Sequence, residues 1–148
     1  MRVILLFVVS ALGCSSGVDA MPMFPENYAA TYQEVRNCRR SLDHDLMTIR
    51  VLASPDAIAP YTGRTLPFGV GAIIVKEQYS DIDTSCAGPV LEYTVMRKTE
   101  SAPDALDWEW QRVDNERHVL EVDLDRCISC HTSCGKAPEG YDGTCTVP

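Results

Sequence analysis

The chain has 148 residues, of which 45% are hydrophobic, and its formal net charge is −8. This length and composition are those of one globular domain that can bury a core of its own. The charge argues against a nucleic-acid partner, because phosphate binding needs clustered Lys and Arg, and the dipeptide Arg39-Arg40 is too short to supply them.

The first 20 residues have the features of an export signal. Arg2 precedes an apolar run at residues 3–9, and this run is too short to span a bilayer. We therefore expect residues 1–20 to be a signal and tether, and residues 21–148 to form the folded domain. Export places the chain in an oxidising space, the bacterial periplasm or the cell envelope.

Two processing sites compete within this signal. Residues 10–14, SALGC, have the form of a bacterial lipobox, in which Cys14 becomes the lipid-modified first residue of a lipoprotein. Residues 18–20, VDA, fit an ordinary cleavage before Met21. The lipobox is favoured, because Cys14 closes the apolar run and a flexible Ser-Ser-Gly tether follows it.

The elements that follow predict an α+β fold. Residues 26–40 place Tyr28, Tyr32 and Val35 at helical spacing, which predicts an N-terminal helix. The absence of βαβ alternation after this helix indicates a mainly antiparallel β-sheet. Strands are expected at residues 46–54, 72–80, 90–98, 107–114 and 118–123, of which the last two form a hairpin.

Near the C-terminus the segment CISCH occupies residues 127–131. A c-type haem needs two thiols that add to its vinyl groups and an imidazole beneath the iron, and Cys-x-x-Cys-His supplies all three from about one helical turn. The motif predicts one covalent haem c on a C-terminal turn or helix, attached through Cys127 and Cys130, with His131 as the axial iron ligand. The alternatives are a zinc site that also uses Cys134, and a direct disulfide between Cys127 and Cys130.

The remaining cysteines suit disulfide bonds. The chain has seven cysteines, and four are left once lipid is assigned to Cys14 and haem to the CISCH pair. An even remainder in an exported protein indicates two disulfides, in one of three connectivities. We expect Cys38–Cys86 and Cys134–Cys145, because the second pair would close a short loop behind the haem turn.

Several segments together carry a family resemblance. LPFGVGAIIVKEQY, YTVMRK, DWEWQRV and RCISCH occur in this order, and SLDHDLMTIRV precedes them. They resemble the cytochrome P460 family, whose relatives include the cytochromes c′-beta, over residues 28–146. The resemblance implies a homodimeric antiparallel β-sheet protein with one haem c and an open iron site. P460-type members oxidise hydroxylamine, whereas the c′-beta type binds small gases such as NO.

The resemblance also implies roles for two residues outside the motif. In P460-type members a lysine of the VKE segment bonds covalently to the haem rim, which implies Lys76, and strand alternation places Lys76 on one face with Ile74. An arginine of the early strand approaches the distal pocket, which implies Arg50 as a catalytic hydrogen-bond donor to a nitrogen ligand. The alternatives are an exposed lysine, and a surface arginine paired with Asp43 or Asp45.

Other side chains were assigned from their type and position alone. Trp108 and Trp110 share one face of the strand predicted at residues 107–114, which predicts that they lie in the core or form a wall of the haem pocket. Glu77 and Glu109 are expected to be solvated. Candidates for a sixth iron ligand, each of which could equally be a loop or core residue, are His44, His118, Met47 and Met96.

Three functions follow from these interpretations. The favoured one is a periplasmic haem oxidoreductase that oxidises hydroxylamine or a similar small nitrogen species and passes electrons to an unidentified redox partner. The second is a non-enzymatic cytochrome for NO binding or electron transfer. The third is a lipoprotein stabilised by disulfides and without haem.

Overall fold

The structure is a computed structural model, and it describes residues 19–100 and 102–145 of the chain. The export signal, both processing sites and Cys14 lie outside the described residues, except for Asp19 and Ala20 at the end of the second site. Within the described part, no helix is long and apolar enough to cross a membrane.

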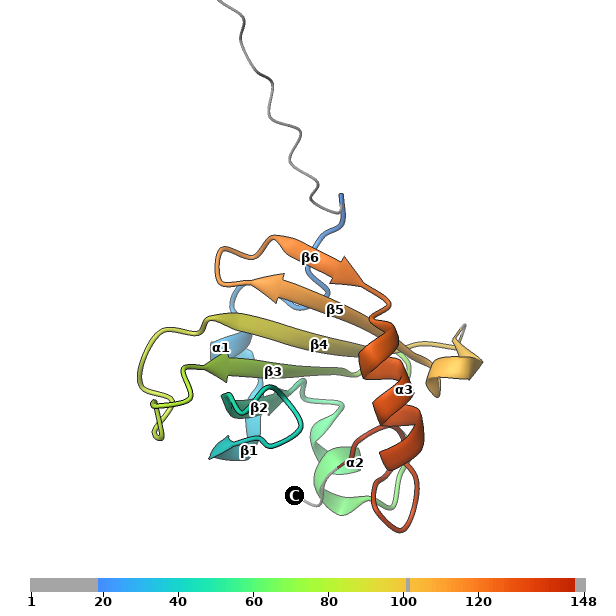
Figure 1. Ribbon diagram of the computed structural model, residues 1–148. Helices are drawn as coiled ribbons and strands as arrows, with labels where there is room; N and C mark the ends of the chain where they lie inside the picture. Colours follow the sequence, from blue (N-terminus) through green and yellow to red (C-terminus); the bar gives the residue numbers. More distant parts are fainter. Residues whose placement is uncertain (1–18, 101, 146–148) are drawn as a thin grey trace, which may run out of the picture.

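Six strands form one sheet in which every neighbouring pair is antiparallel and the spatial order is the chain order (Figure 1). This confirms the predicted antiparallel sheet, including the hairpin of the last two strands, and adds a strand at its edge. The strands are β1 (Gln33–Arg40), β2 (Thr48–Ala53), β3 (Ile73–Tyr79), β4 (Glu92–Lys98), β5 (Trp108–Asp114) and β6 (Val119–Val122).

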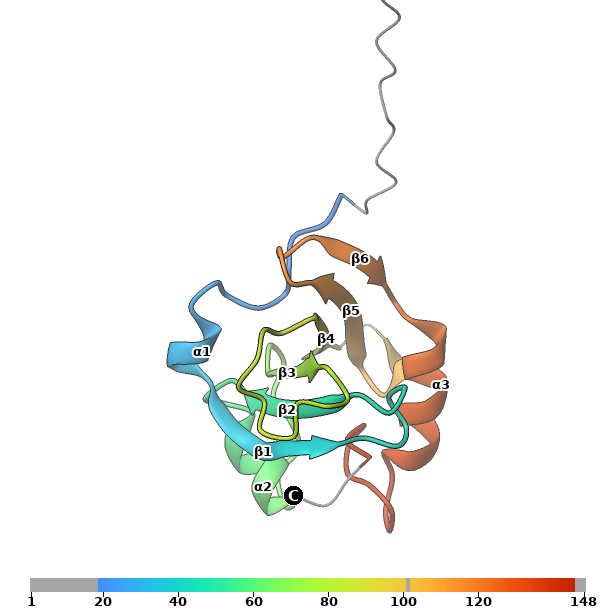
Figure 2. The same ribbon diagram turned by 60° about the vertical axis from the view of Figure 1, so that its left-hand side comes forward.

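Short helices flank the sheet. Figure 2 shows the first and last of them on opposite sides of the strands, and Figure 1 shows the last one crossing the strands near one end of the sheet. They are α1 (Tyr28–Thr31), α2 (Ile58–Gly63), the 3-10 turn η1 (Pro103–Ala105) and α3 (Asp125–Cys134). The CISCH segment therefore lies within a helix of ten residues.

The helix predicted over residues 26–40 is wrong beyond its first turn. Only Tyr28–Thr31 is helical, and the following residues form the edge strand β1. Two side chains that appeared to share a helical face lie on different sides of the sheet: Tyr28 packs in one core cluster and Val35 against the other. Pairing with β2, with two irregularities in its register, provides backbone hydrogen bonds that outweigh the local helical preference.

The sheet has a core on each face. The alternation of β2 and β3 sends Val51 and Ile74 to the face that α3 covers, and Leu52 and Val75 to the face that α1 covers. Both tryptophans of β5, Trp108 and Trp110, lie on the α3 face and are buried, as the sequence predicted.

Candidate functional site

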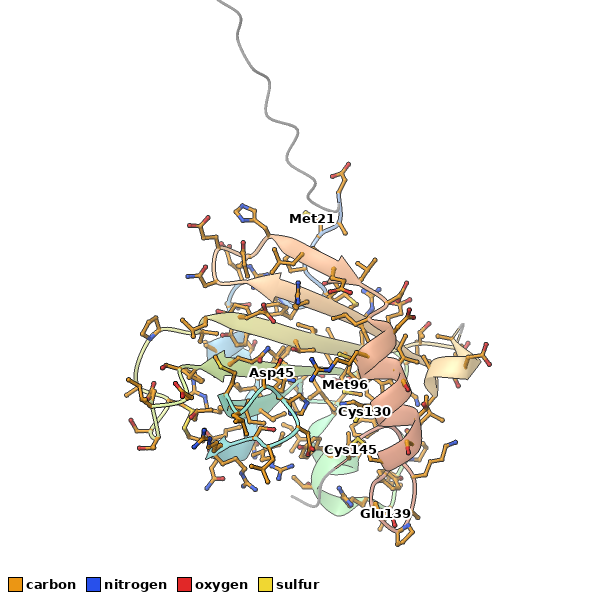
Figure 3. The ribbon with its side chains drawn as sticks, viewed as in Figure 1. Met21, Asp45, Met96, Cys130, Glu139 and Cys145 are labelled. Carbon is orange, nitrogen blue, oxygen red and sulfur yellow. A yellow bond between two sulfur atoms is a disulfide. The ribbon has the colours of Figure 1, made fainter. Side chains whose placement is uncertain are left out.

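A cavity of about 350 Å³ lies on the α3 face of the sheet. This volume falls within the range of small-molecule and cofactor sites. Figure 3 shows three of its lining residues, Met96 from β4, Cys130 from α3 and Cys145 from the C-terminal segment, near one another where α3 crosses the sheet. The sheet provides further lining residues at Ile49, Val51, Ile74, Lys76, Thr94 and Trp110.

His131 enters the cavity from α3 with one ring nitrogen already occupied. Its Nδ1 lies 2.6 Å from the carbonyl oxygen of Gly143, so the neutral imidazole donates Nδ1–H and keeps the lone pair of Nε2 free. Burial lowers the pKa of His131, against the opposing effect of the Gly143 carbonyl, and this favours the neutral ring. The ring also packs edge-on against Trp110, with 4.5 Å between centroids. A neutral ring with a fixed tautomer is the form that binds a metal through Nε2.

Lys76 enters the same cavity from β3, together with Ile74 of the same strand face. Burial lowers the pKa of Lys76 from its ordinary 10.5 to about 8, although nearby Cys127 and Glu92 act in the opposite direction. About a tenth of the amine is therefore neutral at pH 7. A neutral amine is a nucleophile, so the cavity holds a reactive side chain opposite an imidazole.

Two unpaired thiols lie on α3 beside these groups. Cys127 is partly buried against the core on this face, and Cys130 lines the cavity. Their spacing by three residues puts both on adjoining turns of one helix. The two thiols are not joined to each other, and Cys134 is bonded to Cys145. The direct-disulfide alternative is thus contradicted, and the zinc alternative has lost its fourth ligand.

Both expected disulfides are present and are confirmed. Cys38–Cys86 joins β1 to the loop between β3 and β4, and Cys134–Cys145 joins the end of α3 to the C-terminal segment. The second bond encloses the segment that carries the Gly143 carbonyl.

Arg50 is not brought together with the other site residues. Arg50 pairs in register with Glu77, and Val51 pairs with Lys76, so Arg50 points to the face opposite the cavity. Its Nε lies 2.7 Å from a Glu77 carboxylate oxygen, and neither Asp43 nor Asp45 is its partner in the described structure.

Glu77 is a correction to the sequence analysis, which expected a solvated side chain. It is 1% exposed. Its carboxylate accepts bonds from Tyr28 Oη at 2.7 Å and Tyr79 Oη at 2.6 Å in addition to Arg50. Three donors satisfy the buried charge, and two of them, Tyr28 and Arg50, come from segments that sequence spacing does not connect to Glu77.

The structure separates the four candidates for a sixth iron ligand. His44 and Met96 line the cavity. His118 is exposed in the turn between β5 and β6, where it pairs with Asp114. Met47 does not line the cavity.

Ser41, from the loop between β1 and β2, and three arginines of β1 also line the cavity, and sequence reasoning had not assigned these four residues to the site. In this loop Ser41 Oγ lies 2.6 Å from Nδ1 of His44. Burial, together with the charge of Lys76, lowers the pKa of His44 to about 3, so the ring is neutral at neutral pH. The three cationic side chains of β1 that line the cavity are Arg36, Arg39 and Arg40. The double arginine was the available signal, but nothing in the sequence placed it at a cavity.

Comparison with known proteins gives a family for this arrangement. The sequence model of cytochrome P460 matches residues 25–138, which is most of the chain. The chain belongs to the cytochrome P460 family. A search of curated proteins found no match. Membership supports a haem cytochrome and implies a haem cofactor.

The residues of the cavity fit such a cofactor. An imidazole whose Nδ1 is engaged presents Nε2 as an axial ligand, and two free thiols stand one helical turn apart on the same helix as His131. The facing sheet surface is mostly apolar, as a porphyrin requires, and cationic side chains at the rim suit its carboxylates.

Proposed function

We propose that this chain is a mono-haem c cytochrome of the P460 type that oxidises hydroxylamine or a similar small nitrogen species. One observation carries the proposal: Lys76 of the sheet and His131 of α3 line a single cavity, next to two unpaired thiols. Such a combination of a nucleophilic amine, an axial imidazole and a CISCH helix serves no evident purpose in a disulfide-stabilised lipoprotein.

Attachment is assigned to α3. Cys127 and Cys130 would hold a haem c through thioether bonds, and His131 would bind its iron through Nε2. The helix fixes the spacing of the three groups, and Ile128 and Cys127 pack the helix against the sheet.

Lys76 is assigned the second covalent link. Its lowered pKa makes a neutral amine available near pH 8, and its position among apolar neighbours directs that amine into the cavity. A bond from Nζ to a ring carbon of the haem would replace one hydrogen on each atom, and it would release two protons and two electrons to an external two-electron oxidant such as a peroxide. Such a bond would change the electronic properties of the iron.

Substrate oxidation requires an acceptor for protons as well as electrons. When bound, haem supplies an iron that takes up a small nitrogen ligand and removes electrons from it. Asp43 is assigned as the acceptor of these protons, because its carboxylate lines the cavity. His44 is a weaker base, because its pKa of about 3 disfavours the protonated ring.

The cellular setting belongs to the same proposal. Maturation of a haem c and retention of two disulfides both suit an exported protein, with a lipid on Cys14 that attaches it to a membrane. We further propose a homodimer and a separate redox protein that receives the electrons.

The proposal is tested by expressing the chain with a cytochrome c maturation system and recording the ferrous spectrum. A cross-linked haem gives a red-shifted ferrous Soret band, and Lys76→Met should retain bound haem while losing the shift. In the haem-loaded wild type, trypsin should fail to cleave after Lys76. Residues 65–97 should therefore stay in one piece, joined through haem to the peptide that begins at Cys127. An ordinary haem c spectrum with normal cleavage at Lys76 would move the protein to the NO-binding or electron-transfer class, and a colourless protein would refute the haem assignment.

A further inference from the structure

The carbonyl that accepts the His131 hydrogen bond belongs to the segment after α3. We name this segment, residues 135–145, the C-terminal clamp. The match to the family model ends at residue 138, so the part of the clamp that contacts His131 lies outside the matched residues. Any role for it must be argued from its own contacts.

Gly143 is held in place by its backbone. Its N–H donates to the carbonyl of Gly135 at 2.9 Å, which closes the clamp onto the end of α3. Its φ is +85°, in the left-handed region, and a Cβ at this position would lie 2.6 Å from Nε1 of Trp108. Only glycine fits here. The hydrogen bond to Gly135 holds this residue, and with it the carbonyl that His131 contacts.

Asp142 anchors the clamp to the rest of the fold. Its carbonyl accepts the indole N–H of Trp108 at 2.8 Å, and its carboxylate accepts Nζ of Lys98 at 2.7 Å and the backbone N–H of Phe68 at 3.2 Å. These partners come from β5, β4 and the loop before β3. One residue thus connects the clamp to three separate segments, although its own φ of 42° is unfavourable for a residue with a side chain.

The ion pair at this anchor is better shielded than an ordinary surface pair. The side chain of Lys98 is 11% exposed and that of Asp142 is 23% exposed. Lys98 also donates to the carbonyl of Leu106 at 2.9 Å and lies 5.0 Å from the centre of the Trp108 ring. Its geometry is therefore fixed independently, and it can in turn fix Asp142.

The far end of the clamp is covalently attached. Cys145 is bonded to Cys134, the last residue of α3. The clamp is consequently joined to α3 by the chain at one end and by a disulfide at the other, with His131 on the helix between Cys130 and Cys134.

From these contacts we infer that Asp142 is a positioning residue for His131: through the clamp it holds the Gly143 carbonyl on Nδ1 and so sets the midpoint potential of the iron. The inference rests on the proposed function, in which His131 is the axial ligand. Donation from Nδ1 to a fixed carbonyl increases the electron density on Nε2, and a more basic ligand stabilises ferric over ferrous iron. An intact clamp lowers the midpoint potential.

The test uses the haem-loaded protein with Asp142→Asn and Lys98→Met. We expect each variant to shift the ferric–ferrous equilibrium about tenfold toward ferrous iron, at the lower end of what loss of an outer hydrogen bond costs at a metal site. A tenfold shift corresponds to a midpoint potential about 59 mV higher. The iron–histidine stretch in the resonance Raman spectrum of the ferrous protein should move to lower frequency in both variants.

The pair of variants separates the clamp from a simple charge effect. Removing an anion raises a midpoint potential and removing a cation lowers it, so electrostatics alone predicts opposite shifts for Asp142→Asn and Lys98→Met, whereas a loosened clamp predicts a rise in both. The control is Glu139→Gln, which removes a charge from an exposed site in the same segment and should change neither measurement.

Two results would overturn the inference. Opposite shifts, or an unchanged iron–histidine stretch in both variants, would show that Asp142 does not act through His131. If one variant fails to fold, the iron–histidine stretch of the other still decides the matter, because an unchanged stretch would show that the ion pair does not act through His131. A wild-type protein that binds haem without an iron–histidine band would instead refute the proposed axial ligand.

Discussion

Replacing Arg50 by methionine should destabilise the protein without changing its haem site. The change removes the cation from the Glu77 cluster but keeps a long apolar side chain. Glu77 would then remain buried with only two hydroxyl donors, from Tyr28 and Tyr79. Because Arg50 lies on the face opposite the cavity, the spectrum of the haem-loaded protein and the proposed oxidation of hydroxylamine should not change.

The size of the effect follows from the unequal burial of the two partners. The side chain of Glu77 is 2% exposed and that of Arg50 is 31% exposed. Breaking a fully buried pair costs about 3–5 kcal/mol, and an exposed pair contributes about 0–1 kcal/mol. A pair with one buried and one partly exposed member lies between these limits, so we expect Arg50→Met to lower the free energy of unfolding by about 2 kcal/mol.

Urea denaturation followed by far-ultraviolet circular dichroism measures this difference. A matched control is Arg97→Met, because Arg97 forms an ion pair with Glu109 on the same sheet face but both side chains are more exposed, 43% and 34%. That variant should lose less than about 1 kcal/mol. Adding Glu77→Gln to Arg50→Met removes the buried charge and should recover about 1 kcal/mol.

The reasoning would be refuted if Arg50→Met were as stable as Arg97→Met, since the pair would then behave as a surface pair. Loss of hydroxylamine oxidation at unchanged stability would have a different meaning. It would restore the role that the family resemblance implied for Arg50, as a donor in the distal pocket.

Three further predictions concern the buried lysine, a disulfide and the signal. In haem-free protein the pKa of Lys76 is about 8 when folded and about 10.5 when unfolded. Between these pH values the unfolded chain binds more protons than the folded one. The free energy of unfolding should therefore rise by up to about 3 kcal/mol as the pH increases from 8 to 10.5. Lys76→Met should abolish the rise, and an equal rise in both proteins would contradict the pKa shift. Replacing Cys38 and Cys86 together by serine should cost about 2–4 kcal/mol in urea denaturation, because the unfolded chain is released from a long closed loop. Cys14→Ser should release the exported protein from membranes, and a soluble wild type that begins at Met21 would favour the ordinary cleavage site instead.

The sequence by itself determined the parts that depend on local pattern. Alternation in β3 was enough to place Lys76 on one face with Ile74, because side chains of a strand point to opposite faces in turn. The spacing of CISCH was enough to identify a candidate haem helix. Counting cysteines, with the lipid and haem assignments in place, indicated two disulfides in one of three connectivities, and the short loop between Cys134 and Cys145 favoured the pairing that the structure shows.

Tertiary structure alone decided which face holds the cavity and what surrounds it. The family resemblance implied Arg50 as a site residue, and the sequence predicted a solvated Glu77. Period-2 alternation could correct neither prediction, because it does not say which of the two faces α3 will cover. The residues from 33 to 40 carried a helical pattern, yet pairing with β2 made them a strand. His44 lines the cavity and the Gly143 carbonyl contacts His131. Both placements depend on contacts between residues far apart in the chain, which no local pattern encodes.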